Sequence, residues 1–166
     1  MATQTLKAAD LNTYLRDNLL ELAPAKATTE GGYFVSTGVN TIAERVPETA
    51  TVLTQESTTS TSYTNLATVG PSVTVTTGTR ALVFTHCQLF NTTADTAVFA
   101  SWAMTGATTR SAFDVTAISL DGPNCQVGDM DLLTDLTPGS TTFTMKYRVA
   151  AGTGFFLNRK IIVMPL

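Results

Sequence analysis

The chain has 166 residues, a length that suits one domain of ordinary size with an appendage. Its formal net charge is -3 and it has no basic run or basic–aromatic stripe, so nucleic-acid binding is not expected. No apolar segment is long enough to span a bilayer, so membrane insertion is not expected either. The first 22 residues lack a basic start and a continuous apolar stretch, which argues against a signal peptide.

The N-terminal stretch predicts a short helix. Asp10 is a plausible N-cap and Pro24 is expected to end the helix. One stripe at spacings of three and four is made by Leu11, Tyr14, Leu15, Asn18, Leu19 and Leu22. Isolated helices need about 12–15 residues even with ideal composition, so we expect this one to dock on its own domain, on sister chains or on a foreign partner.

The segment after the helix is rich in Pro, Gly and Thr, which predicts an extended arm with short strands around Tyr33–Val35 and Ile42–Arg45. Threonine supplies much of the polarity of the whole chain, whose charged residues make up only 14%. Threonine is β-branched and favours strands. From the helix, the Pro-, Gly- and Thr-rich arm and the strand-rich remainder, we divide the chain into a helix and anchor (1–30), an extended arm (31–50) and a β domain (51–166).

Short strands are predicted in quick succession through the β domain. They are expected at residues 51–55, 60–70, 72–77, 80–91, 96–104, 111–119, 141–150 and 155–166, with a long loop around 120–128. Residues 80–91 are apolar on both faces, which predicts a central strand covered twice. The expected inward-facing residues are Val73, Val75, Trp102, Phe113, Val115, Ala117, Phe143, Met145, Tyr147 and Val149. This pattern predicts an all-β protein, a jelly-roll-like antiparallel β-sandwich.

The chain offers little that would support catalysis. His86 and Cys87 are neighbours on a predicted strand, so their side chains point to opposite faces and cannot act together. A disulfide between Cys87 and Cys125 is one interpretation, and two separate thiols, with Cys87 buried, is the one we favour. No catalytic residue and no cofactor are therefore expected.

Metal binding and glycosylation have weak signals. Asp129, Asp131 and Asp135 could form a calcium site, but the EF-hand spacing is absent and a solvated turn is favoured. Asn91 begins an acceptor-like "NTT" that we interpret as a turn. No metal site is expected.

Three segments carry a resemblance: "LNTYLRDNLLEL", "APAKATTEGGYFVSTGVNTIAER" and "LTPGSTTFTMKYRVAAGTGFFLNRKIIVMPL". Together they resemble a family of small phage virion proteins, in which an N-terminal helix precedes a compact β domain that ends in a hairpin. Members of that family are minor tail, head-fibre or capsid decoration proteins. The β domain is also similar, at the level of fold alone, to trimeric complement-like and tumour-necrosis-factor-like jelly rolls.

The resemblance to the phage virion family implies a non-enzymatic virion protein, assembled in the host cytoplasm, with the major capsid protein or other virion proteins as partners. The fold-level similarity to trimeric jelly rolls implies a homotrimer as its oligomeric state. The helix stripe would then be the docking surface and the β domain the displayed module. The first hypothesis is a capsid decoration protein. The alternative is a tail or baseplate protein that binds a host glycan through Tyr63, Trp102 or Phe155 and Phe156, although Trp102 is expected in the core.

Overall fold

The structure is a computed structural model that describes residues 7–20 and 26–166. The chain divides into two compact units, Met1–Val46 and Pro47–Leu166. The first unit contains α1 (Ala8–Leu20), β1 (Tyr33–Gly38) and β2 (Thr41–Arg45). The second contains β3 (Glu48–Val52), β4 (Glu56–Thr58), β5 (Ser72–Thr77), β6 (Ala81–Asn91), β7 (Val98–Gly106), the 3-10 turn η1 (Asp114–Thr116), β8 (Ile118–Leu120), β9 (Cys125–Leu133), β10 (Gly139–Val149) and β11 (Gly154–Pro165).

The helix of the first unit begins earlier than the sequence predicts. It starts at Ala8, so the prediction of Asp10 as N-cap is wrong and Asp10 lies in the first turn instead. A carboxylate there still interacts favourably with the unpaired N–H groups and the dipole at this end. Pro24, expected to end the helix, lies outside the described residues.

The two short strands predicted for the arm are confirmed as an antiparallel hairpin of β1 and β2. The carboxylate of Glu44 on β2 accepts hydrogen bonds from the backbone N–H groups of Thr28 and Thr29, at 3.1 and 3.0 Å. These bonds connect Thr28 and Thr29, which precede the hairpin, to β2 of the hairpin. The bonds from Thr28 and Thr29 also hold the pKa of this carboxyl below its ordinary value.

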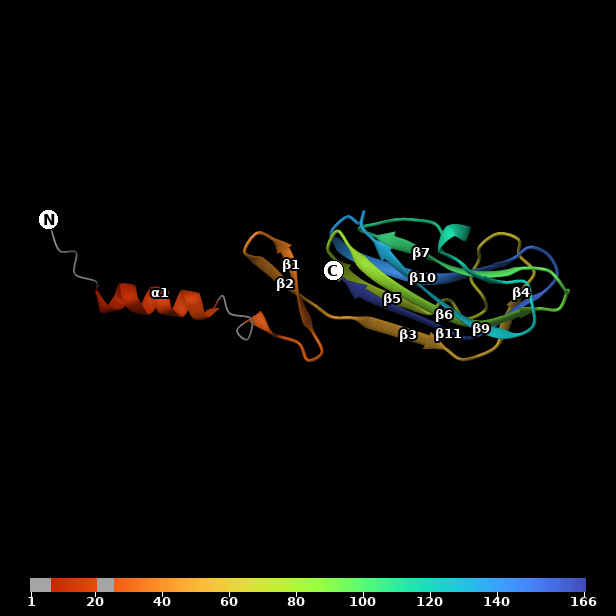
Figure 1. The fold of residues 1–166 in the computed structure, drawn as a ribbon, viewed down its shortest axis with the longest axis horizontal. Coiled ribbons are helices and arrows are strands. Elements are labelled where there is room, and N and C mark those ends of the chain that lie inside the picture. Colours follow the sequence, from red (N-terminus) through yellow and green to blue (C-terminus); the bar gives the residue numbers. More distant parts are fainter. Residues whose placement is uncertain (1–6, 21–25) are drawn as a thin grey trace. The chain divides into compact units, whose positions relative to one another are not determined.

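The second unit is a sandwich of two antiparallel sheets (Figure 1). One sheet has the strand order β5-β10-β7-β8, and the other has the order β3-β11-β6-β9 with β4 added beside β11. The prediction of an all-β antiparallel sandwich is therefore confirmed. The central position predicted for residues 80–91 is also confirmed, because β6 pairs with β11 on one side and β9 on the other.

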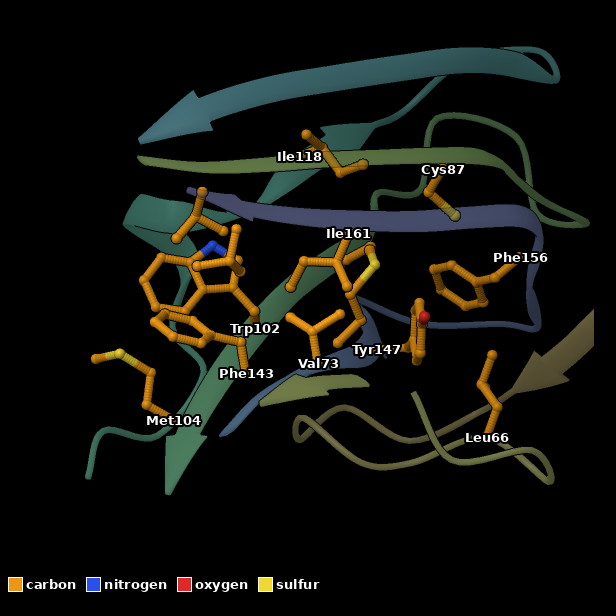
Figure 2. Packing of buried hydrophobic residues seen from close by; sticks show 14 of the residues in the cluster. Leu66, Val73, Cys87, Trp102, Met104, Ile118, Phe143, Tyr147, Phe156 and Ile161 are labelled. Atoms are coloured by element: carbon orange, nitrogen blue, oxygen red, sulfur yellow. The ribbon is translucent and has the colours of Figure 1, made fainter. Parts of the chain in front are cut away.

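The core lies between the two sheets and follows the alternation of their strands (Figure 2). Along β10 the inward residues Phe143, Met145, Tyr147 and Val149 are all fully buried, as predicted. Trp102 of β7 lies tilted against Phe143 with ring centroids 5.8 Å apart. Between the two sheets, the Tyr147 ring of β10 packs against the Phe156 ring of β11 with ring centroids 4.9 Å apart, as expected where the inner faces of a β-sandwich meet.

Three predictions about the sandwich are wrong, and each fails for a local reason. Residues 60–70 form an irregular segment because Ser and Thr hydroxyls bond nearby backbone, as Ser60 does to the carbonyl of Ser62 at 2.7 Å. In residues 111–119 the chain forms η1, which leaves Phe113 and Val115 exposed instead of in the core. Gly128, expected in a loop, lies inside β9.

A bulge in β11 brings a charge into the core. The pairing of β11 with β6 shifts between Leu157 and Lys160, and Asn158 there adopts a positive φ of 50°. The extra residue reverses which side chains point inward, so Arg159 is buried and Lys160 faces solvent. Without the bulge, the alternation from Phe156 would place Lys160 in the core.

Arg159 is fully buried and is held by a carboxylate and by backbone carbonyls. Its guanidinium pairs with Glu56 at 2.9 Å, and the Glu56 side chain is 12% exposed. It also donates to the carbonyls of Thr54 and Gly70, each at 3.4 Å. The guanidinium carbon lies 5.3 Å from the Tyr147 ring centroid, and the Tyr147 hydroxyl donates to the same Gly70 carbonyl at 2.9 Å. Arg159 therefore joins the irregular segment before β5 to β11.

Glu56 should make the stability of the protein depend on pH. Burial alone would raise the pKa of Glu56, but hydrogen bonds from Thr68 and the charge of Arg159 outweigh it and hold the pKa below its ordinary value of 4.5. The ionised form is thus favoured in the folded state, so its stabilisation is present above pH 4.5 and is lost as the pH falls through the lowered folded pKa. Urea unfolding between pH 7 and 3 should show this loss in the wild type and a weaker one in Glu56→Gln. Equal pH dependence in the two proteins would contradict it.

Candidate functional site

The helix residues predicted as a docking surface lie on α1 and are exposed. The described apolar members of the predicted stripe range from 48% exposed for Leu11 to 66% for Tyr14, with Leu15 and Leu19 between them. Asn18 is exposed in the same stripe, and Leu22 lies outside the described residues. We call Leu11, Tyr14, Leu15, Asn18 and Leu19 the α1 stripe.

The α1 stripe has charged residues beside it. Arg16 and Asp17 form an exposed ion pair at 3.3 Å on the part of the helix away from the stripe centre. A helix of 13 residues is about 20 Å long at a rise of 1.5 Å per residue. This geometry suits insertion of four apolar side chains into a groove on another surface, with the ion pair left at its rim.

The residues weighed for catalysis do not form a catalytic arrangement. His86 faces outward, and its ring Nδ1 lies 3.0 Å from the carbonyl oxygen of Asn158 in the β11 bulge. Cys87 faces the core, where burial raises the pKa of its thiol to about 12 and keeps it protonated. Cys87 and Cys125 are both free thiols, one buried and one exposed, so the preferred interpretation of two separate thiols is confirmed.

The three aspartates weighed for calcium are dispersed. Asp129 and Asp131 lie on β9, not on a turn, and Asp135 pairs with Arg110 at 2.7 Å. Within residues 7–20 and 26–166, no group of three or more His, Cys, Asp or Glu side chains is arranged to hold a metal ion. The same described part of the chain contains no helix long and apolar enough to cross a membrane.

Most of the aromatic residues weighed for glycan binding are engaged within the fold. Trp102 and Phe156 are buried in the core. The Tyr63 hydroxyl donates to Asp114 at 2.9 Å, and burial and this carboxylate both raise the Tyr63 pKa. Phe155 remains partly accessible on the outer side of its sheet, where it stacks on Phe90 at 4.9 Å.

Asp114 also binds an arginine that stacks on an aromatic ring. Arg148 donates to both carboxylate oxygens of Asp114, at 2.9 and 2.6 Å, and its guanidinium lies 3.8 Å from the Phe99 ring centroid. The hydrogen bonds from Arg148 and Tyr63 lower the Asp114 pKa. These contacts attach η1 to the outer side of the sheet that contains β10, and we assign them a structural role.

Sequence reasoning missed a second uncovered surface, on the outer side of the sheet β3-β11-β6-β9. Strand register places residues of β9, β6 and β11 in adjoining rows there. These residues, which we call the apolar sheet face, are Leu82, Phe84, Met130, Leu132, Ile162 and Met164. Met130 is 55% exposed and the four residues of β6 and β11 are half-buried. The sequence of β6 did contain a sign of this surface, because its apolar residues on both faces predicted a strand covered on both sides. In the structure, the sandwich covers only the inner face of β6.

The outer side of the opposite sheet has a different character. Ser72, Thr74 and Thr76 of β5 are exposed there beside the threonines of β10. Two hydroxyl pairs cross between the strands, Ser72 with Thr144 at 2.8 Å and Thr74 with Thr142 at 2.7 Å. A hydroxyl-covered surface of this kind is well hydrated, so the two outer sides of the sandwich are suited to different surroundings.

The class that the fold defines is an antiparallel β-sandwich of jelly-roll type with a separate helical unit. No family model matches the sequence, and no curated protein matches it. A solved structure described as the crystal structure of the infectious bursal disease virus VP2 subviral particle is similar in fold, with a TM-score of 0.54 at 12% identity over 79% of this chain. The chain spans 36% of that protein.

Structures of the Gt and Gx strains of infectious bursal disease virus also match, with TM-scores of 0.41 and 0.39. They are 12% and 9% identical to this chain over 83% and 79% of its length, and the chain spans 40% and 36% of those proteins. At 12% identity, the likeness to the VP2 subviral particle shows a shared fold and nothing further.

Proposed function

We propose that this chain is a non-enzymatic structural protein of a phage virion, and most specifically a capsid decoration protein. In this proposal α1 docks on the major capsid protein or another virion protein, and the sandwich is displayed outside as part of a homotrimer. The observation that carries the proposal is the α1 stripe, four apolar side chains about half or more exposed on a helix outside the compact sandwich unit. The fold shared with the VP2 subviral particle supports a place in a viral shell.

The physical reason is the instability of such a helix in isolation. A 13-residue helix is marginal in water, and it becomes stable when its apolar stripe is buried. Each buried Leu would contribute roughly 1.5–3 kcal/mol, so the three described leucines of the stripe suffice for firm docking when many copies bind one lattice. Leu22 belongs to the same proposed surface.

Virion incorporation tests the docking role of the α1 stripe. Replacing Leu15 and Leu19 with Asp should reduce incorporation into purified virions by roughly a hundredfold or more, because the burial of two leucines contributes about 3–6 kcal/mol. Incorporation is measured as copies per virion by quantitative immunoblotting. The control is Thr13→Asp, which adds one negative charge to α1 on the side opposite the stripe.

The stability of the sandwich in the double variant distinguishes docking of α1 on a virion protein from packing of α1 on its own β domain. We expect the double variant to be soluble, with a thermal melting curve of the wild-type shape, because the substituted residues are exposed on a separate unit. Normal incorporation of the double variant, or loss of incorporation in Thr13→Asp as well, would refute docking through the stripe.

A further inference from the structure

Three side-chain amides form a row across the outer side of the sheet β3-β11-β6-β9. Nε2 of Gln88, on β6, donates to Oδ1 of Asn124 at 3.0 Å. Nδ2 of Asn158, in the β11 bulge, donates to Oε1 of Gln88 at 2.8 Å. The row therefore runs from the residue just before β9, across β6, to β11, and we call these three residues the amide row. Because each amide holds the next, the groups are oriented before any ligand binds.

The amide row keeps part of its hydrogen-bonding capacity free. A primary amide has two N–H donors and an acceptor oxygen with two lone pairs. Among the hydrogen bonds of residues 7–20 and 26–166, none uses Nδ2 of Asn124 or Oδ1 of Asn158. Asn124 is exposed, and Gln88 and Asn158 are half-buried. The row thus presents both donors and acceptors, and it carries no charge.

Two aromatic rings lie beside the amide row on the same side of the sheet. Phe90 of β6 and Phe155 of β11 are paired in register, and both are half-buried. Phe90 is two residues from Gln88, so both side chains point to the outer side. The two rings are nearly parallel, at 7°, with centroids 4.9 Å apart. Rings lying flat beside each other would be farther apart, so these rings stand on edge and form an aromatic ridge.

A depression of about 310 Å³ adjoins both features. It is lined by residues 91–95, directly after the β6 member of the aromatic ridge, and by residues 121–123, directly before the first member of the amide row. Asn91 holds the first of these loops. Its Oδ1 accepts from the backbone N–H of Thr93, and its Nδ2 donates to the carbonyl of Ala151, both at 2.9 Å. The depression gives the otherwise flat surface the concave part that ligand sites usually have.

The charges near the depression select against an anionic ligand. Asp95 and Asp121 are both in its lining, and neither forms an ion pair among the described residues. Their carboxylates would repel a phosphate or an acidic sugar, whereas a hydroxyl group can donate to them. Lys160 is exposed on the same side of the sheet but is in register with His86, farther along β6 from the depression.

We propose that the amide row, the aromatic ridge and the adjoining depression bind a neutral oligosaccharide. Sugar hydroxyls donate and accept at the same atom, which matches the mixed donors and acceptors of amides. The C–H groups of a sugar ring are apolar and can pack on the aromatic ridge, in the usual combination of aromatic contact and a few placed polar groups. This binding goes beyond the proposed structural role and depends neither on docking of α1 nor on the oligomeric state.

Other classes of ligand fit this surface less well. Nucleic acid needs clustered cations to neutralise its phosphates, and Lys160 is a single cation. Protein interfaces are centred on buried apolar anchors, whereas the centre of this surface is a row of amides. A neutral oligosaccharide requires neither feature.

Binding is measured by isothermal titration calorimetry on the purified full-length chain. The probes are oligosaccharides of glucose, galactose, mannose, rhamnose and N-acetylglucosamine, together with sialylated and uronic-acid oligosaccharides. We expect at least one neutral probe to bind, and the acidic probes not to bind. Binding of acidic probes alone, or of none, would overturn the proposal. The assay contains no virions, so its result is independent of the test of α1 docking.

Substitutions then locate the site for the neutral probe that binds. Asn124→Ala and Phe155→Ala should each weaken binding about tenfold, on the order of one lost hydrogen bond or ring contact. The matched controls are Asn12→Ala, at an exposed position of α1, and Phe113→Ala, on the opposite sheet, and both should bind like the wild type.

Two further results keep the proposal open to refutation. Asn124 is exposed, so Asn124→Ala should have a wild-type melting curve by circular dichroism and report on binding even if Phe155→Ala is less stable. Lys160→Gln should change binding less than about twofold, because a neutral ligand does not need the cation. Unchanged binding in Asn124→Ala, or loss of binding in Lys160→Gln, would contradict a neutral oligosaccharide at the amide row.

Discussion

Replacing Arg159 with Met should lower the free energy of unfolding by about 3–5 kcal/mol, the usual cost of removing one partner of a buried ion pair. The large cost is expected because Glu56 would keep its negative charge in a nearly buried position. The carbonyls of Thr54 and Gly70 would lose their guanidinium donor at the same time. Urea unfolding at pH 7 gives the free energy directly.

Two further variants separate the charge from the packing. Arg80→Met removes a cation from an exposed position and should change stability by less than about 0.5 kcal/mol. In the double variant Arg159→Met with Glu56→Gln, no unpaired carboxylate remains, so the loss should be smaller than the sum of the two single losses. Strict additivity would show that Glu56 and Arg159 are not coupled, contrary to the contact between them.

Trp102→Ala is expected to cost about 3–5 kcal/mol, because it leaves a large cavity in the core. Trp102 is almost fully buried, and its ring packs on Phe143 of β10, the neighbouring strand in the same sheet. The matched control is Phe113→Ala, an aromatic truncation at an exposed position, which should cost far less. Thermal and urea unfolding measure both. A small effect for Trp102→Ala, comparable with that for Phe113→Ala, would contradict the position of Trp102 in the core.

The sequence predicts the sandwich best where a strand is half-buried and regular. Residues 72–77 are predicted with the bounds that β5 has, and the alternation of β10 correctly identifies Phe143, Met145, Tyr147 and Val149 as core. Both strands obey a period of two without interruption, so local pattern and tertiary burial agree.

The failures occur where hydrogen bonds or sheet position override the pattern. Phe113 and Val115 alternate like strand residues, but the carbonyl of Phe113 accepts from the Ser101 and Thr116 hydroxyls and the chain turns there. β9 is an edge strand whose Asp and Gly residues resemble a loop, and natural edge strands often carry such charges. The bulge at Asn158, which decides that Arg159 and not Lys160 is buried, has no signal in the pattern of apolar residues.

The two candidate docking surfaces also differ in how well the sequence predicts them. The α1 stripe could be predicted from a 3.6-residue period within one segment, and the structure leaves its described apolar members exposed. The apolar sheet face joins residues from three strands that are far apart in the sequence, so it needs the strand register. The apolar residues on both faces of β6 predicted that both faces are covered, but they do not identify what covers the outer face.

The most direct test of the proposed function is localisation of this chain on purified virions by immunogold labelling or cryo-electron microscopy, compared with virions that carry the Leu15→Asp, Leu19→Asp variant. We expect regular density in many symmetric copies over the head, with the helix at the lattice surface, and its loss in the variant. Label confined to the tail, or a chain absent from the particle, would contradict capsid decoration.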